Sequence, residues 1–376
     1  MTLVEALDSR RIVLCVGSGG VGKTTTAAAL ALAAARRGRA TVVLTVDPSQ
    51  RLKDALGLGA LDGRPRRVPL AEPGARLDAM LLDVKRTFDE LVQGLASSPE
   101  QARRVLDNRL YQNLSGTLAG TAEYMAVETV YRLVEEDRYD LVVVDTPPAR
   151  HAVDFLDAPR RLVALLDSRA FTILKDPTSI LPGASSRLAQ YVLQGVLHGL
   201  ERFTGIGLVR EIGEFVHAIE TLTDAFRGRV TAVDRLLRSA GTTLVMVTAP
   251  EPRLATETEA LARALATIRL PIDGVIVNRA LPPAVFGPDA PEPPPLDGLP
   301  APLAARLAAG FRELRTLAAR QAASLEPLLH LAGAPVLAQV PLLAAAPASL
   351  ADLALVADHL LPPVDDTPAA NDAGPR

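Results

Sequence analysis

The stretch GSGGVGKTT combines residue types that suit the binding of a phosphate group. Four glycines between positions 17 and 22 let the backbone take positive φ and pass close to an anion, so that successive N–H groups can point at it. The pattern G-x-x-x-x-G-K-[ST] is a Walker A loop, in which the lysine reaches the β- and γ-phosphates and the threonine hydroxyl reaches Mg²⁺. The sequence therefore predicts a site for ATP and Mg²⁺ formed by Gly17, Ser18, Gly19, Gly20, Val21, Gly22, Lys23, Thr24 and Thr25.

The residues around this loop agree with that interpretation. The apolar run IVLCV (12–16) precedes it, and the Ala-rich segment 24–38 follows, ending in a glycine that is a common helix stop. A helix beginning at Thr24 would add the positive end of its dipole to the site. A second apolar run, LVVVD, ends in Asp145, which predicts a carboxylate for Mg²⁺ or its bound water. A plain glycine turn would leave Lys23 and Thr24 unexplained.

Short runs rich in β-branched residues recur along the chain. We expect them to form the strands that position the loop residues and Asp145. None alternates cleanly between apolar and polar residues, which suits strands covered on both faces of a parallel sheet. Helical segments lie between the runs, so the predicted fold class is α/β, a doubly wound, mostly parallel sheet that carries a P-loop. The runs are 12–16, 41–46, 141–145, 243–248, 274–278 and 336–340, and the helical segments between them include 24–38, 123–138 and 251–268.

Residues 160–240 interrupt this alternation, because apolar residues recur there at helical spacing without a strand-like run. Such stripes are either core faces that pack on each other or the walls of a groove for a client. We expect a single P-loop domain over 1–376 with a helical subdomain inserted at 160–240. The segments beyond it predict a proline-rich irregular loop (281–302), one long helix (303–333) and a disordered tail (362–376).

Composition excludes several classes of protein. The chain has 40 basic and 43 acidic residues among 376, a balance that argues against binding nucleic acid. Its single cysteine, Cys15, excludes a disulfide within the chain and a metal site built from cysteines of one chain. The sequence shows neither a signal peptide nor an apolar run of about 18 residues, so we expect a cytoplasmic protein without a membrane-spanning segment.

Four motifs occur in an order that resembles a known family. They are the loop at 17–25, VDPSQRL (46–52), VVVDTPPARHAVDFL (142–156) and VNR (277–279). Together they are similar to the arsenite-pump-driving ATPases, a family that includes the ATPase targeting tail-anchored membrane proteins, and most closely to its actinobacterial branch. The resemblance covers roughly 10–156 and 240–360. It implies a SIMIBI-type P-loop fold and a dimeric, ATP-hydrolysing switch that couples nucleotide state to a membrane-related client through the helical subdomain.

The resemblance also implies roles for individual residues. Asp47 would orient or deprotonate the attacking water, and it would form the catalytic pair with Lys23; the alternative is that Asp47 merely starts a turn with Pro48. Asp145 and the loop after it would sense the γ-phosphate, with His151 as a relay or as an ordinary structural residue. The family's adenine-contacting asparagine corresponds to Asn278, and Pro341 lies where the family closes over the base.

One departure from the family pattern is Ser18, which stands where the family has a lysine that touches the phosphates of the partner subunit. A short neutral side chain cannot do this, and three interpretations follow. A paralogue that carries the lysine forms a heterodimer with this chain, which is the interpretation we favour of the three, while the sequence leaves a homodimer open as well. Alternatively, Arg51 or Arg150 supplies the charge, or hydrolysis is slow and the chain is mainly a nucleotide-gated switch.

Other family features have no counterpart here. With one cysteine, neither an arsenite site nor a zinc ion held between subunits by a CxxC motif is expected. None of the four methionines falls in the inserted segment, so the adaptable methionine-rich groove typical of hydrophobic clients is missing, and client binding stays a hypothesis. The leading function is therefore an ATPase switch. The alternatives are a largely non-hydrolysing regulatory subunit and a small-molecule kinase.

Overall fold

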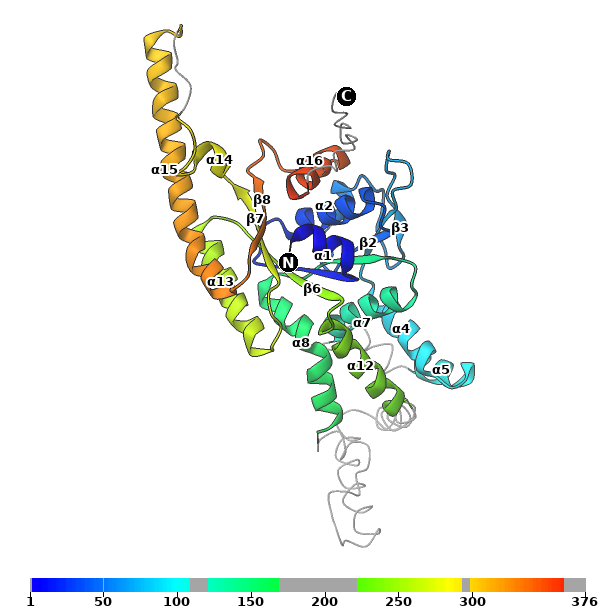
Figure 1. Cartoon of the computed structure of the whole chain (residues 1–376). Helices are drawn as coiled ribbons and strands as arrows, with labels where there is room; N and C mark the ends of the chain where they lie inside the picture. Colours follow the sequence, from blue (N-terminus) through cyan, green and yellow to red (C-terminus); the bar gives the residue numbers. More distant parts are fainter. Residues whose placement is uncertain (1, 50, 109–120, 169–221, 293–297, 362–376) are drawn as a thin grey trace, which may run out of the picture.

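The computed structural model describes residues 2–49, 51–108, 121–168, 222–292 and 298–361, and its centre is a single sheet (Figure 1). The described part contains an eight-stranded sheet in the order β3-β4-β2-β5-β1-β6-β7-β8. Every pairing is parallel except that of β3 with β4. The strands are β1 (Ile12–Val16), β2 (Thr41–Thr45), β3 (Arg66–Arg67), β4 (Leu77–Leu81), β5 (Leu141–Asp145), β6 (Thr242–Thr248), β7 (Gly274–Ala280) and β8 (Val336–Pro341). The predicted α/β class is confirmed.

Helices cover both faces of the sheet, as a doubly wound fold requires. The central strands are buried along their whole length because alternate side chains enter two separate apolar cores. One core contains α1 (Leu3–Ser9), α2 (Lys23–Arg36), α3 (Arg51–Ala55) and α16 (Leu350–Leu360). The other contains α4 (Val84–Leu95), α7 (Thr121–Glu135), α8 (Ala149–Leu166), α12 (Thr223–Leu237), α13 (Pro252–Thr267) and part of α15 (Ala301–Ala332). Two short helices, α5 (Pro99–Leu106) and α14 (Pro283–Phe286), complete the described elements.

The strands β3 and β4 were not predicted from the sequence. The run LDAML of β4 carries Asp78 as its second residue, which hides the apolar pattern. In the fold Asp78 is 5% exposed, and its carboxylate accepts hydrogen bonds from Tyr139 Oη at 2.7 Å and pairs with Arg67 Nε at 2.9 Å. A buried carboxylate is tolerated there because its partners come from other elements, which a local pattern does not contain.

Much of the predicted helical insertion lies outside the described residues. Helix α8 runs to Leu166 and α12 begins at Thr223, so only the two ends of the segment 160–240 are described. The predicted tail at 362–376 also lies outside them. The single domain with its inserted subdomain therefore stays a prediction. Within the proline-rich segment the short helix α14 forms, and the predicted long helix after it is confirmed as α15.

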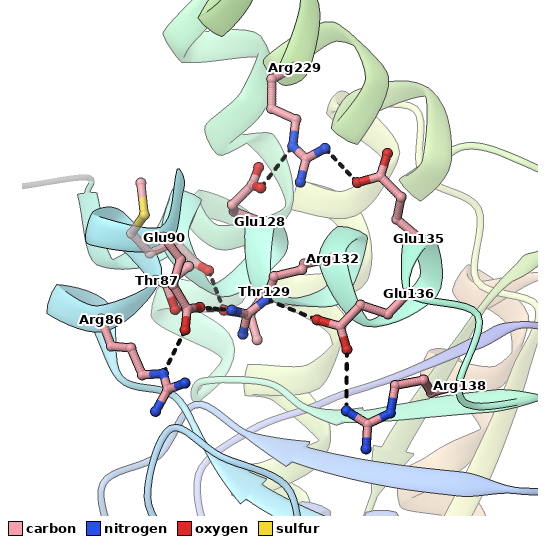
Figure 2. A network of polar contacts seen from close by, with 11 residues as sticks. Arg86, Thr87, Glu90, Glu128, Thr129, Arg132, Glu135, Glu136, Arg138 and Arg229 are labelled. Atoms are coloured by element: carbon pink, nitrogen blue, oxygen red, sulfur yellow. Dashed lines mark hydrogen bonds and ion pairs between the residues drawn. The ribbon is translucent and has the colours of Figure 1, made fainter. Parts of the chain in front are cut away.

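A network of ion pairs joins the helices next to this segment (Figure 2). Arg229 of α12 donates to Glu128 Oε1 at 2.8 Å and to Glu135 Oε2 at 2.7 Å, both on α7. Glu128 is 2% exposed, and this burial raises the pKa of its carboxyl, while Arg229 acts in the opposite sense. A hydrogen bond of 3.0 Å between Thr87 and Thr129 ties α4 to α7. These polar contacts therefore hold the helices α4, α7 and α12 together as one group that packs against the sheet.

Across the described ranges, no helix has both the length and the apolar composition required to span a membrane.

Candidate nucleotide-binding site

The glycine-rich loop lies between β1 and the N-terminus of α2, where the glycines are required by close contacts. Gly22 has φ +91°, and a Cβ there would lie 2.2 Å from the side-chain nitrogen of Asn278. A Cβ on Gly17 would lie 2.1 Å from the carbonyl oxygen of Val247. A larger residue at either position would push the loop away from β6 or β7. At Gly17 and Gly22 the loop thus packs tightly against β6 and β7. At Gly19 and Gly20, by contrast, a Cβ would meet no atom within 4 Å.

Lys23 is held inside this loop. Its side chain is largely buried, and Nζ donates a hydrogen bond of 2.8 Å to the carbonyl oxygen of Ser18. Burial lowers the pKa of Lys23, and the carboxylates of Asp145 and Asp47 act in the opposite sense. The loop itself therefore holds the ammonium group at the cavity, and its contact with the phosphates of a nucleotide stays a prediction.

Asp145 ends β5 beside the loop and is 1% exposed. Its Oδ2 accepts a hydrogen bond of 2.9 Å from Thr45 Oγ1 at the end of β2. Burial raises the pKa of Asp145 to about 6, although hydrogen bonds from Thr24 and Thr45 and the charge of Lys23 lower it. A hydroxyl and a carboxylate are hard oxygen donors, and Mg²⁺ in nucleotide sites takes only one or two protein ligands besides phosphate and water. Thr24 and Asp145 therefore fit a magnesium ion.

Asp47 follows β2 and reaches the same cavity. Its Oδ1 accepts a hydrogen bond of 2.9 Å from the backbone N–H of Ser49, which closes a turn. Within the part of the chain that the structure describes, Oδ2 makes no hydrogen bond. The geometry is compatible with both interpretations of this residue, because one oxygen serves the turn and the other remains available to a water molecule.

One cavity of about 710 Å³ collects most of the predicted site residues. Its size lies within the range typical of sites for small molecules, which is about 300–1,000 Å³. Three residues of the loop, Gly17, Ser18 and Val21, are buried on the side that faces away from the cavity. They support the loop and do not line the cavity. The predicted residues that line it are Gly19, Gly20, Gly22, Lys23, Thr24, Thr25, Asp47, Asp145, Asn278 and Pro341.

The two residues assigned to the adenine base lie on the cavity wall. Asn278 donates from Nδ2 to the carbonyl oxygen of Val21 at 2.8 Å and accepts at Oδ1 from the N–H of Arg279 at 2.9 Å. Its amide thus ties β7 to the loop, a role that the sequence motif did not indicate. The contact of Asn278 with adenine stays a prediction, as does that of Pro341 at the end of β8.

Ser18 points into the protein rather than out of it. It is 0% exposed, and its Oγ lies 2.9 Å from Oγ1 of Thr258 on α13. Thr258 in turn donates to the carbonyl oxygen of Leu254 at 2.7 Å. Of the arginines that could replace the missing lysine, Arg51 lines the cavity, whereas the side chain of Arg150 lies outside the described residues. His151 is exposed on α8.

The sequence reasoning missed Thr45 and Thr258. Thr45 ends the run TVVLT, and a threonine at a strand end carries no distinctive signal. Thr258 lies within a helix that was recognised, but no local pattern shows which of its residues meets the loop.

Replacing Ser18 by lysine is expected to destabilise the fold by about 3 kcal/mol, because the ammonium would be forced into a buried space shared with Thr258. Chemical denaturation of the purified variant measures this. The control is Ser97→Lys at an exposed position, where a change within about 0.5 kcal/mol is expected. Parental stability of the Ser18→Lys variant would contradict the tight packing of this position.

Comparisons with known proteins cover most of the chain. A sequence model of the family described as anion-transporting ATPase matches residues 10–287. The chain is 28% identical to ATPase GET3 of Podospora anserina over 286 residues, which are 74% of this chain and 76% of that protein. It is 27% identical to ATPase GET3 of Phaeosphaeria nodorum, with 74% and 80% covered, and 26% identical to ATPase ASNA1 homolog 1 of Paramecium tetraurelia, with 74% and 78% covered.

Proposed function

The chain belongs to the anion-transporting ATPase family, and from this premise we propose that it is a dimeric switch in which ATP binding and hydrolysis control the engagement of a membrane-related client. Membership makes the chain a P-loop ATPase that binds a nucleotide, and it agrees with the resemblance read from the four motifs. The finer placement in the actinobacterial branch stays a prediction. The cytoplasm is the proposed location.

The observation that carries the proposal is the cluster of Lys23, Asp145 and Asp47 around one cavity. In the proposed chemistry, Lys23 holds the β- and γ-phosphates, and Thr24 with Asp145 holds Mg²⁺. The ion, when bound, would shield the negative charge of the phosphates. Asp47 would orient the attacking water through its available oxygen.

The connection from the cavity to the helices supports a switch. The hydroxyl of Thr146, directly after Asp145, donates to the carbonyl oxygen of Cys15 at 2.8 Å, and the next two residues lead into α8. Helix α8 packs on α12 and α7, so a shift of the loop after Asp145 would be passed to the helices that flank the predicted insertion. The client would bind on that helical side.

A second candidate function is a regulatory subunit with little hydrolysis of its own. Ser18 favours it, because its side chain is neutral, is 0% exposed and contacts Thr258, so it supplies no charge to a partner's phosphates. A heterodimer with a lysine-bearing paralogue would then be the active form, and a homodimer with Arg51 in the lysine's role is the competing arrangement.

The test measures client binding in two nucleotide states. A labelled 20-residue peptide rich in Leu and Ala is expected to bind the chain about tenfold more tightly with a non-hydrolysable ATP analogue than with ADP, a difference of about 1.4 kcal/mol. A peptide of the same length with polar residues interspersed is the control. Equal affinity in both states would contradict the switch.

Phosphate release by the purified chain separates the two candidates. Multiple turnovers by the isolated chain support the ATPase switch. Release that begins only when a lysine-bearing paralogue is added supports the regulatory subunit.

A further inference from the structure

Helix α15 carries a stripe of exposed leucines. It runs along the β8 edge of the sheet, and its N-terminal half extends beyond the other elements (Figure 1). Half of the twelve large apolar side chains that stay exposed in the described part fall between 299 and 331. Four of them and one glycine follow the 4-3-4-3 spacing of a coiled-coil seam. These residues, which we call the α15 stripe, are Leu303 (42% exposed), Leu307 (48%), Gly310, Leu314 (38%) and Leu317 (46%).

The same spacing continues into the protein core. Three positions of the repeat further along, past Gln321 and Ser324, lead to Leu328, which is 0% exposed, and its neighbour on the helix face, Leu325, is 7% exposed. Both belong to the core that also contains α13. The C-terminal part of the seam is therefore covered by the protein itself, whereas the leucines of its first half stay 38–48% exposed.

Gly310 in the middle of the stripe has no explanation within the chain. A glycine inside a helix costs about 1 kcal/mol relative to alanine. A Cβ at Gly310 would meet nothing within 4 Å, so the fold does not need the missing side chain. A glycine on an apolar seam leaves a notch into which a facing leucine can fit.

Charges flank the stripe on one side only. Arg306 and Glu313 lie seven residues apart on that side, and both are exposed. The other flank turns toward the body, where Phe311 packs on Phe286 of α14 with ring centroids 5.4 Å apart. A parallel pair of such helices would set one flank against the other and leave both charges without partners. An antiparallel pair sets the charged flank against itself, so Arg306 meets Glu313 of the other helix.

We propose that α15 pairs antiparallel with α15 of a second copy of this chain, about an axis between Ala308 and Ala309. This register places Leu303 against Leu314 and Leu307 against Gly310, each twice, and it forms two Arg306–Glu313 ion pairs. The inference rests on the proposed dimeric switch and gives that dimer a surface. In this register the buried ends of the two helices would lie about 25 Å to either side of the axis.

The pairing is also connected to the nucleotide cavity. Helix α15 ends at Ala332 and leads directly into β8, and the segment from Val340 to Ala348 lines the cavity. Helix pairing and nucleotide binding would therefore both affect the position of the cavity wall that this segment forms.

Cysteine cross-linking tests the register. The native Cys15 is fully buried, so engineered cysteines alone are accessible to an oxidant. A mixture of Leu303→Cys chains and Leu314→Cys chains is expected to form disulfide-linked dimers. Neither variant alone should do so, because its two copies would be about 16 Å apart along the helix axis, beyond the reach of a disulfide. Cross-linking of either variant by itself, or none in the mixture, would overturn the register.

Sedimentation measures the contribution of the stripe. Leu307→Glu is expected to raise the dimer dissociation constant at least tenfold, whereas Ala305→Glu on the opposite, exposed face should leave it unchanged. The single change Arg306→Glu should weaken the dimer severalfold, and the double change Arg306→Glu with Glu313→Arg should restore it. This rescue uses exposed residues, so it does not depend on the folding of a core variant.

The outcomes separate the pairing from the proposed function. A parental chain that stays monomeric with and without ATP overturns both the dimer and the pairing, while its phosphate release still reports the ATPase. A parental dimer that Leu307→Glu leaves intact overturns the pairing alone.

Discussion

Replacing Lys23 by alanine is expected to lower ATP turnover by on the order of a thousandfold. The ammonium group is buried in the loop and held 2.8 Å from the Ser18 carbonyl oxygen. Its position is therefore fixed before the phosphates bind. A preorganised charge in a buried site stabilises the charge that develops in the transition state, and no other lysine or arginine of the loop can replace it. Steady-state phosphate release measures the effect.

The control for this variant is Lys85→Ala. Lys85 lies on α4, where it pairs with Asp89 at 2.8 Å on the surface, away from the cavity. Turnover of this variant should stay within twofold of the parent. A loss of less than tenfold in the Lys23→Ala variant would contradict the proposed role of the lysine.

Replacing Asp47 by asparagine is expected to reduce turnover by on the order of a hundredfold while ATP affinity changes little. Asparagine keeps an oxygen that can accept from the Ser49 N–H, so the turn after β2 is retained. The charge needed to orient or deprotonate the water is lost. Single-turnover kinetics measure the chemical step, and calorimetry measures the affinity for ATP.

Asp54→Asn is the matched control, because Asp54 also lines the cavity and is exposed on α3. If both variants lose activity equally, the effect comes from the general charge of the cavity. If Asp47→Asn lowers the melting temperature but not the turnover, the residue acts only in the turn with Pro48.

Most of the fold could be predicted where the signal is local. The runs around β1, β2, β5, β6 and β7 are continuous and apolar because both faces of these strands are covered, and the edge strand β8 is also marked by a local apolar run. The strand β4 could not be predicted, because the burial of Asp78 depends on Tyr139 and Arg67. No short stretch of sequence contains all three residues. Helix α15 was expected from its composition, but the exposure of its first half depends on where the body ends.

The glycine-rich loop could also be predicted from the sequence, since the residues that carry its chemistry lie within nine consecutive positions. Positive φ at Gly20 and Gly22 and a helix beginning at Lys23 follow from local steric rules. The motif therefore predicts where the nucleotide site lies without any information on long-range contacts.

The surroundings of the loop depend on residues far away in the chain. Ser18 meets Thr258 across 240 residues, and Asn278 meets Val21 across 257. Thr45 reaches Asp145 only because β2 and β5 are neighbours in the sheet. Backbone conformation is governed by neighbours in sequence, so it could be read from the motif. The burial of Ser18 is governed by strand order and helix packing, and these bring together groups whose separation along the chain carries no pattern.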